Sequence, residues 1–551
     1  MSRYNYKRRY SHPVRVGSDV IIGGDSPIRI QSMTNTSTLD TTSSARQIAR
    51  IAAEGAHLVR LTTQGVAEAE NMAPIDEAVK ALGVDIPLVA DVHFNPKAAF
   101  TAARTCRKVR INPGNFVDAA RTFLKLDFTD EEYAEEIQKI RDTFIPFLNV
   151  CRENNTAIRL GVNHGSLSDR IMSRYGDTPA GMVESVMEYL RIAVEENFHN
   201  IVISIKASNV VVMVATVRLL VREMEKEGMN FPLHLGVTEA GDGEDGRIKS
   251  AAGIGTLLAE GLGDTIRVSL SEPPENEIPV AIALRDYITA REGHAPVVAP
   301  DSTLSSADSP LRDKAVPADG LGKTPWPLVI GYDLALPDSA VSIDASSDPA
   351  VAIRLTGSPI ILTSRHINPV GEMSAWMERY YQKGGTSPVI ISLNYDDADK
   401  DIIRLKAAAD FGALLLNGYA NAISIHADAL SADEVNLLAL AILQACRLRF
   451  SKTEYIACPG CGRTLFRLQD TLAEVKRATS HLKGLKIGVM GCIVNGPGEM
   501  ADADYGYVGA GPGRVSIYKG KTLINKNLPT ADALPALIDL IKSNGDWKEP
   551  S

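Results

Sequence analysis

The chain has few cysteines, few aromatic residues and no long apolar run. Six of its 551 residues are cysteine and 6% are aromatic, which argues against a small scaffold held together by disulfides. No stretch approaches the roughly 18 consecutive apolar residues of a membrane span, and residues 1–10 lack the apolar core of a secretory signal. We therefore expect a cytoplasmic protein that does not bind membranes.

The chain also lacks a strong excess of either charge. Its net charge is -9 and its pI is near 5.7, so nothing general favours nucleic-acid binding. Hydrophobic residues make up 45% and charged residues 23%, which is ordinary for a globular protein. A polyanionic ligand would therefore have to be held by a local basic site.

Three cysteines near the C-terminal end lie in two motifs. The first is Cys458-Pro-Gly-Cys461, and the second runs from Gly491-Cys492 through a Gly-Pro-Gly turn to Glu499. Zinc ribbons share the Cys-x-x-Cys spacing but use a second such pair, which this sequence lacks. Three thiolates and a carboxylate favour a [4Fe-4S] cluster with one exchangeable, non-cysteine corner. A structural zinc site with His481 as fourth ligand is the alternative.

The remaining cysteines have no partner at ligand spacing. We expect Cys106, Cys151 and Cys446 to behave as small buried apolar residues.

The first 270 residues contain eight short runs rich in β-branched residues. Nearly every run is followed by a segment of helical period, which predicts a (β/α)₈ TIM barrel. The predicted strands are Ile28–Gln31, Leu58–Thr62, Pro87–Val92, Val109–Asn112, Ile158–Val162, Ile201–Lys206, Leu233–Thr238 and Thr265–Leu270.

Composition then divides the rest of the chain. We predict a barrel domain over 1–290, a Pro-, Ala- and Ser-rich linker over 291–325, an inserted α/β domain over 326–450 and a small α/β iron–sulfur domain over 451–551. The expected strands of the insert are Trp326–Gly331, Val351–Thr356, Pro388–Leu393 and Ala422–His426. In the last domain we expect helices near Gln469–Leu482 and Ala531–Ser543, and strands at Lys486–Met490 and Val515–Tyr518.

Four of the predicted barrel strands carry one arginine between two aliphatic residues. Because neighbouring side chains of a strand point to opposite faces, the arginines should face the barrel interior. With a lysine on the sixth strand they form a cationic set, which fits a diphosphate better than a neutral substrate. The set is Arg60, Arg110, Arg159, Lys206 and Arg267. The alternative is that each arginine forms a structural ion pair with an acid such as Asp91 or Glu239.

Polar residues also follow the strands, at the end of a barrel where active sites lie. Glu239 is the best candidate for an acid or base, although pairing with Arg267 or Lys206 is an equal alternative. His93 and His164 are candidates for hydrogen-bond or proton donors.

These motifs together resemble the 4-hydroxy-3-methylbut-2-enyl diphosphate synthase family. The resemblance rests on stretches in the barrel and in the C-terminal domain. They are Ile30-Gln-Ser-Met-Thr, Val59-Arg-Leu-Thr, Val89-Ala-Asp-Val-His-Phe, Val109-Arg-Ile-Asn-Pro-Gly-Asn, Arg159-Leu-Gly-Val-Asn-His-Gly-Ser-Leu, Thr238-Glu-Ala-Gly, Cys458-Pro-Gly-Cys-Gly-Arg-Thr-Leu-Phe and Cys492-Ile-Val-Asn-Gly-Pro-Gly-Glu. The insert is similar to that of the three-domain members. One departure is Gly460, where many relatives have serine.

The resemblance implies an iron–sulfur oxidoreductase of isoprenoid, and hence terpene, biosynthesis by the methylerythritol phosphate route. Its substrate would be 2-C-methyl-D-erythritol 2,4-cyclodiphosphate, which is opened and reduced by two electrons with loss of water. By position, Arg60, Arg110, Arg159, Asn163, Lys206, Arg267 and Ser269 would hold the diphosphate. Cys458, Cys461, Cys492 and Glu499 would hold the cluster, and Glu239 would lie near the reacting carbons.

The sequence shows no nicotinamide or flavin fingerprint, so we expect the electrons to come from another protein. The resemblance implies that this donor is ferredoxin or flavodoxin, and the sequence does not decide between them. The oligomeric state stays open between a monomer and a homodimer. The rival hypothesis is a TIM-barrel enzyme of the pterin-binding type, acting on a phosphorylated substrate, with a structural metal site. A second rival is a non-catalytic electron-transfer or metal-dependent binding protein.

Overall fold

The computed structural model describes residues 3–118, 127–301, 310–355, 357–493, 496–500 and 502–550. The chain forms two compact units, each built from several segments. The larger unit comprises Tyr10–Gly246, Gly263–Ala281 and Lys452–Ser551, and the smaller comprises Met1–Arg9, Arg247–Leu262 and Ile282–Ser451. The predicted domains are consecutive segments of the chain, whereas each unit combines several segments. The predicted domain bounds therefore stay a prediction.

The described residues of the larger unit contain an eight-stranded parallel sheet in the order β8-β7-β6-β5-β4-β3-β10-β9. A parallel bridge between Ile203 on β8 and Leu233, next to β9, joins the two ends of this order. The predicted TIM barrel is therefore confirmed. Its strands are β3 (Arg29–Met33), β4 (Leu58–Thr63), β5 (Leu88–Val92), β6 (Lys108–Ile111), β7 (Ala157–Asn163), β8 (Ile201–Lys206), β9 (His234–Leu235) and β10 (Thr265–Ile266).

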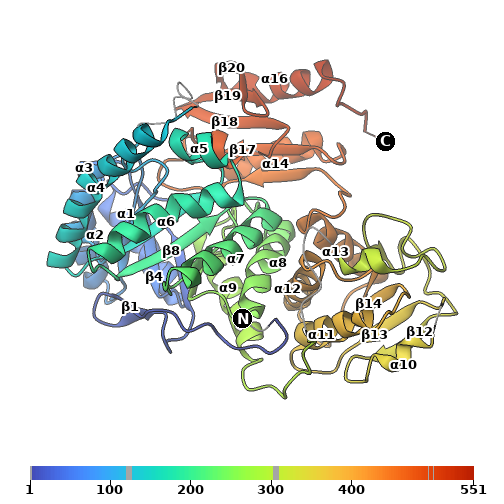
Figure 1. The fold of residues 1–551 in the computed structure, drawn as a ribbon. Coiled ribbons are helices and arrows are strands. Elements are labelled where there is room, and N and C mark those ends of the chain that lie inside the picture. Colours follow the sequence, from blue (N-terminus) through green and yellow to red (C-terminus); the bar gives the residue numbers. More distant parts are fainter. Residues whose placement is uncertain are drawn as a thin grey trace. The chain divides into compact units, whose positions relative to one another are not determined.

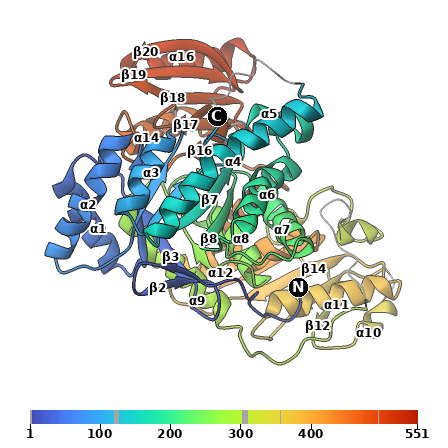
Figure 2. The same ribbon diagram turned by 60° about the vertical axis from the view of Figure 1, so that its left-hand side comes forward.

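Helices alternate with these strands along the chain, and Figure 2 shows several of them surrounding β7 and β8. Local capping fixes where they start. For example, Asn95 accepts a hydrogen bond from the backbone N–H of Ala98, and Pro96 occupies the first turn of α3. The helices are α1 (Thr41–Ala53), α2 (Val66–Ala81), α3 (Pro96–Thr105), α4 (Asp130–Glu153), α5 (Asp169–Tyr175), α6 (Pro179–Glu195), α7 (Val210–Lys226), α8 (Gly243–Ala259) and α9 (Glu277–Thr289), with the 3-10 turn η1 (Pro274–Asn276).

A short antiparallel hairpin closes the N-terminal end of the barrel. It consists of β1 (Val14–Val16) and β2 (Val20–Ile22). Its buried aliphatic side chains pack against residues at the starts of four barrel strands, namely Leu58, Val89, Ala157 and Val202. This hairpin could not be predicted from the sequence, because its strands are too short to show a clear alternation.

The smaller unit contains a parallel sheet whose described strands follow the order β11-β15-β14-β13-β12. Figure 1 labels three of them, β14, β13 and β12. They are β11 (Leu328–Val329), β12 (Val341–Asp344), β13 (Ile360–Thr363), β14 (Val389–Asn394) and β15 (Ala422–His426). Its helices are α10 (Ala350–Ile353), α11 (Pro369–Gln382), α12 (Lys400–Leu416) and α13 (Ala432–Ala445), with the 3-10 turn η2 (Leu311–Lys314). The fold class predicted for the insert is thus confirmed.

One strand predicted in this unit is wrong. Residues 350–353 form the short helix α10, whereas the strands are β12 and β13, which lie on either side of it. The last residue of the predicted strand, Thr356, lies outside the described residues. The run of aliphatic residues there was too short to distinguish a helix from a strand.

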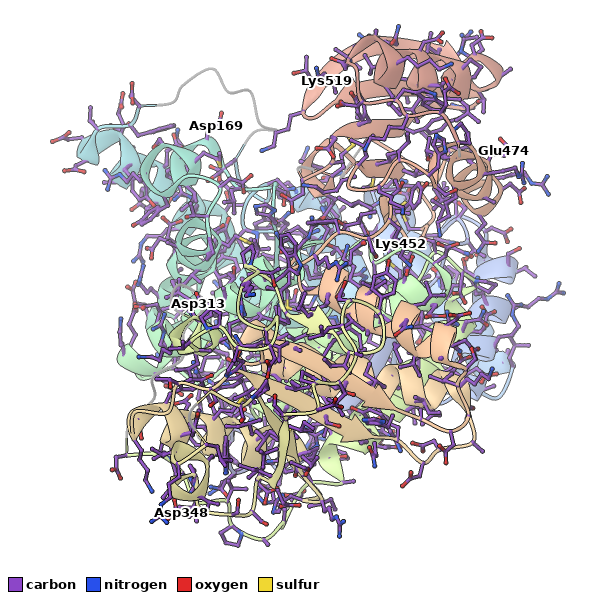
Figure 3. The ribbon with its side chains drawn as sticks, turned by 90° about the vertical axis from the view of Figure 1, so that its right-hand side faces the viewer. Asp169, Asp313, Asp348, Lys452, Glu474 and Lys519 are labelled. Carbon is purple, nitrogen blue, oxygen red and sulfur yellow. The ribbon has the colours of Figure 1, made fainter. Side chains whose placement is uncertain are left out.

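The C-terminal part of the larger unit is a mixed five-stranded sheet within the described range, in the order β16-β17-β18-β19-β20. Its first three strands are parallel and its last two pairs antiparallel. The elements are β16 (Glu454–Ala457), α14 (Leu468–Thr479), β17 (Lys486–Met490), α15 (Gly496–Glu499), β18 (Tyr505–Gly511), β19 (Arg514–Lys519), β20 (Thr522–Pro529) and α16 (Thr530–Ser543). Figure 3 labels Glu474 on the exposed side of α14 and Lys519 at the end of β19.

Two expectations from composition concern the burial of three cysteines and membrane-spanning segments. Cys106, Cys151 and Cys446 are 6%, 0% and 2% exposed, so they are buried as predicted. Among the described residues no helix is both long and apolar enough to cross a membrane.

Candidate active site

One cavity brings together residues from the barrel and from the cysteine motifs. It contains about 710 Å³ of space not occupied by atoms, which suits a small-molecule site. All the site residues predicted from sequence line it, except Glu499 and His164: Arg60, His93, Arg110, Arg159, Asn163, Lys206, Glu239, Arg267, Ser269, Cys458, Cys461 and Cys492. The barrel and the C-terminal domain thus contribute to the same cavity within one chain.

The cations come from different barrel strands, and they face the barrel interior. They are Arg60 on β4, Arg110 on β6, Arg159 on β7, Lys206 on β8 and Arg267 directly after β10. Arg60, Arg110, Arg159, Lys206 and Arg267 are all at most 8% exposed. Gly161 makes room for one of them, since a Cβ atom there would lie 2.5 Å from Nε of Arg110. The guanidinium of Arg110 then donates to the carbonyl oxygen of Gly161 (2.9 Å) and to Oδ1 of Asn163 (3.3 Å).

Asp91 is the acidic centre of the barrel wall. Its carboxylate lies 3.1 Å from Arg110 and 3.8 Å from Arg60. Burial alone would raise the pKa of Asp91, but these two guanidinium groups hold it well below its usual value. The alternative reading of an ion pair with Asp91 is therefore confirmed for Arg60 and Arg110, although both also line the cavity.

His93 is next to this group. Burial and the charge of Arg110 lower the pKa of His93 to about 3, so its ring is neutral at physiological pH.

Arg267 is paired with Glu277, a residue that the sequence analysis missed. The two side chains form two hydrogen bonds, of 3.0 and 2.9 Å. Glu277 is 1% exposed and also accepts hydrogen bonds from the hydroxyl of Ser32 and the N–H of Leu270. The alternative prediction that Glu239 pairs with Arg267 or Lys206 is not tested by these contacts and stays a prediction. The nearness of Glu277 to the eighth strand could have suggested its pairing with Arg267.

Arg159 and Lys206 lie deep in the same wall. Two nitrogens of Arg159, Nε and Nη1, have no hydrogen-bond partner among the residues that the structure describes. Burial and the neighbouring arginines lower the pKa of both Arg159 and Lys206 well below their usual values. Unlike the charges of Arg60, Arg110 and Arg267, these charges call for a bound anion.

Glu239 follows the seventh strand in an unusual backbone conformation. Its φ is +49°, in the left-handed region that few side chains adopt. The next residue, Ala240, forms a parallel bridge with Ala457, directly before Cys458. Strain of this kind is often found at functional sites, and it brings Glu239, which is 7% exposed, to the cavity wall.

The cysteines receive N–H donors as thiolates do. The N–H of Gly491 donates to Sγ of Cys458 (3.2 Å), and Arg463 donates to Sγ of Cys461 from its backbone and from Nε (3.5 and 3.4 Å). Burial raises the pKa of Cys458. Burial opposes ionisation of Cys461 too, but the Arg463 charge outweighs it and lowers the pKa of Cys461.

Arg463 was not singled out from sequence. It is 8% exposed and lies 3.6 Å from Asp91, so it connects the cysteine loop to the acidic centre of the barrel. Its position two residues after Cys461 was the only signal for it.

Within the described range no three His, Cys, Asp or Glu side chains are grouped as they would be around a single metal ion. Ligands of a multi-iron cluster are spaced more widely, since each binds a different iron atom. Three cysteines around one cavity, two of them with N–H···S hydrogen bonds, fit such a cluster.

Glu499 lies beside the cavity and contacts the barrel. Its carboxylate accepts hydrogen bonds from Nδ2 of Asn163 and from the hydroxyl of Thr238, the latter over 3.0 Å. The hydroxyl of Ser208 donates to its backbone carbonyl (3.3 Å). Burial and the charge of Glu239 raise the pKa of Glu499.

The backbone of the Glu499 turn touches the barrel directly. A Cβ atom on Gly165 would lie 2.2 Å from the carbonyl oxygen of Gly498, and the φ of Gly165 is +80°. Only glycine fits there, which sets how closely the two segments approach.

Comparisons with known proteins agree with this geometry. Residues 11–282 match the family described as GcpE TIM-barrel domain, and residues 454–543 match the GcpE protein C-terminal domain. A protein of Phocaeicola vulgatus named 4-hydroxy-3-methylbut-2-en-1-yl diphosphate synthase (flavodoxin) is 53% identical, with 100% of both chains covered. The chain belongs to the 4-hydroxy-3-methylbut-2-en-1-yl diphosphate synthase family.

Other members of this family match over the whole chain. A Bacteroides fragilis protein of the same name is 52% identical, covering 100% of this chain and 98% of its own. A chloroplastic relative from Oryza sativa subsp. japonica, named with ferredoxin, is 38% identical and covers 100% and 89%. The predicted family is therefore confirmed, as are an oxidoreductase activity and a place in isoprenoid biosynthesis by the methylerythritol phosphate route. The family is one of iron–sulfur enzymes.

Proposed function

We propose that this chain converts 2-C-methyl-D-erythritol 2,4-cyclodiphosphate to 4-hydroxy-3-methylbut-2-enyl diphosphate. The reaction takes up two electrons and two protons and releases one water. The observation that carries the proposal is the shared cavity, in which five barrel cations face three cysteines. The pterin-type alternative gives the cysteines only a remote structural role, so it does not explain why they line the cavity.

The barrel cations would bind the diphosphate. Arg60, Arg110 and Arg267 are paired with Asp91 or Glu277, whereas Arg159 and Lys206 form no ion pair with any described residue, so they would gain most from an incoming anion. Asn163 and Ser269 line the same cavity and would fix the orientation of the phosphate groups. As negative charge moves onto the diphosphate oxygen during ring opening, these fixed cations would stabilise it.

Cys458, Cys461 and Cys492 would hold a [4Fe-4S] cluster, with Glu499 as a fourth, exchangeable ligand. Such a cluster supplies electrons one at a time and offers an iron that can bind an oxygen ligand. Asn163 and Thr238 would hold the Glu499 carboxylate whenever it is not a ligand. Glu239 lies at the cavity wall, where it would transfer a proton to the departing hydroxyl.

The electron donor would be a flavodoxin or a ferredoxin, as the names of the relatives state for those proteins. An outer groove offers it a place to dock. Cys461 lines both the cavity and this groove, whose walls include Phe466 and Arg467. Residues 452–551 contain 13 Lys and Arg against 10 Asp and Glu, whereas the whole chain has 58 against 67. This local positive balance suits a small acidic redox protein.

We also propose the domain bounds 1–290, 291–325, 326–450 and 451–551. We propose a cytoplasmic location, and the oligomeric state stays open between a monomer and a homodimer. The cytoplasm is supported by the low cysteine content, which suits a reducing compartment.

The test is anaerobic turnover of the cyclodiphosphate by the purified holoprotein with a strong one-electron reductant. We expect formation of the allylic diphosphate, together with iron and acid-labile sulfide in the protein. Zinc in place of iron, with no turnover, would contradict the proposal and favour the pterin-type alternative. Full diphosphate binding by an Arg159→Met variant would favour the non-catalytic reading instead.

A further inference from the structure

Beneath the cavity the barrel interior is polar where barrels usually carry Val, Ile and Leu. Five buried side chains lie next to the cavity without lining it. Gln31, Lys108 and Ser204 each precede a cavity-lining residue of the same strand by two positions and so point inward. His234 and Thr265 begin β9 and β10, four and two positions before the cavity-lining Thr238 and Arg267. All are at most 2% exposed. We call them the buried polar layer: Gln31, Lys108, Ser204, His234 and Thr265.

Much of this layer lacks hydrogen bonds. In the described part of the chain, Nζ of Lys108, both amide atoms of Gln31 and Nε2 of His234 have no partner. The two unpaired nitrogens of Arg159 belong to the same region. Unpaired buried polar groups lower the stability of the fold, so a functional role would explain why this layer is polar.

Lys108 is the most unusual member. It is 0% exposed, and the charged groups that act on it are cations, Arg159 on β7 and Arg60 on β4. His234 on β9 feels the charge of Lys108 in turn. The wall carboxylate Asp91, on the neighbouring strand β5, is already shared between Arg60 and Arg110. Burial and the neighbouring arginines therefore lower the pKa of Lys108 well below its usual value.

A diphosphate in the cavity would reverse this balance. Its negative charges would offset the field of Arg159 and Arg60, which is what disfavours an ammonium group below them. We propose that Lys108 takes up a proton when a diphosphate binds above it and thereby becomes a further cation of the diphosphate site. Lys108 would act from behind Arg159, as a positioning residue that does not touch the substrate. The inference rests on the proposed function only in requiring that the cavity binds a diphosphate.

Calorimetric titration of the anaerobic holoprotein with methylenediphosphonate tests this. The same titration is run at one pH in buffers of different ionisation enthalpy, which gives the number of protons taken up per ligand. We compare the wild type, Lys108→Met and a matched control, Lys97→Met, which removes an exposed lysine at the start of α3. Because the ligand is the same, its own protonation cancels in the comparison.

We expect the wild type and the control to take up more protons than Lys108→Met, whose affinity should fall about tenfold. Equal proton uptake in all three proteins would overturn the inference. If methylenediphosphonate binds to none of them, the proposed function fails instead. Lys108→Gln keeps a polar side chain and serves if the methionine variant does not fold.

The pH dependence of thermal unfolding gives an independent readout. A buried lysine whose pKa is lowered binds fewer protons in the folded than in the unfolded chain, so stability rises with pH between the two pKa values. We expect the unliganded wild type to show this rise as the pH increases toward the ordinary lysine pKa, and we expect the rise to be smaller in Lys108→Met. An identical pH slope in the two proteins would show that Lys108 is already charged without ligand and would overturn the inference.

Discussion

Ser271 holds the backbone of Cys458 to the barrel, because its hydroxyl donates to the carbonyl oxygen of Cys458 over 2.8 Å. The same hydroxyl lies 3.2 Å from the carbonyl oxygen of Ala457, and the N–H of Ser271 donates to Gly241. Ser271 is 3% exposed and follows the eighth barrel strand. One side chain thus ties the loop after β10 to the first cysteine motif.

We predict that Ser271→Ala lowers the free energy of unfolding by about 1 kcal/mol, through loss of these hydrogen bonds. It should also shift the electron paramagnetic resonance signal of the reduced cluster, since the Cys458 backbone is no longer held. Ser271→Thr keeps the hydroxyl and is the control. An unchanged signal in Ser271→Ala would argue that other contacts position this loop.

Cys492 and Glu499 should differ in what their removal does. We predict that Cys492→Ala loses the cluster, because a thiolate ligand cannot be replaced by a methyl group. Glu499→Ala should keep most of its iron but lose most turnover, since the proposed role of Glu499 is that of an exchangeable fourth ligand. Iron and sulfide analysis with anaerobic kinetics measures both, and equal iron loss in the two variants would contradict the exchangeable role of Glu499.

Arg267 is paired with a buried acid, whereas Arg159 has unpaired nitrogens within the described part of the chain. Replacement by methionine should therefore lower stability at Arg267 and diphosphate affinity at Arg159. Arg267→Met leaves Glu277 buried without its cation and should lower the free energy of unfolding by about 3–5 kcal/mol. Arg159→Met removes a cation that has unpaired nitrogens, so stability should hold while the dissociation constant for a diphosphate rises at least about tenfold.

Denaturant unfolding and ligand titration separate the two effects. Addition of Glu277→Gln to the Arg267 variant should restore part of its stability, because the uncompensated charge is removed. Equal losses of stability in both single variants would show that Arg159 has a structural partner after all.

Arg467 is placed to contact the electron donor. Its side chain is 91% exposed at the outer groove that Cys461 lines. We predict that Arg467→Glu raises the dissociation constant for a flavodoxin about tenfold at low ionic strength and leaves turnover with a small chemical reductant unchanged. Lys526→Glu, on β20, makes the same charge change away from the groove and should bind normally. Equal weakening by both variants would indicate that only net charge matters.

Much of this fold could be predicted from the sequence. The barrel strands alternate regularly with helices, and the arginines stand between aliphatic neighbours, so both the barrel and its inward cations follow from residue order alone. The cysteine motifs are equally local. Such features need only the periodicity of one segment at a time.

The parts that were missed depend on contacts between distant segments. The pairing of Arg267 with Glu277 and the link between Arg463 and Asp91 require knowing how loops fold back on the barrel. Helix α10 was taken for a strand because four aliphatic residues fit either structure. The partners of Glu499 lie more than 250 positions away, beyond any sequence pattern.

The β1–β2 hairpin determines which end of the barrel is open to ligands. Its apolar side chains close the end of the barrel opposite to the cysteines, so no ligand can pass from there to the arginines. Substrate, product and expelled water must all use the mouth that the C-terminal domain borders.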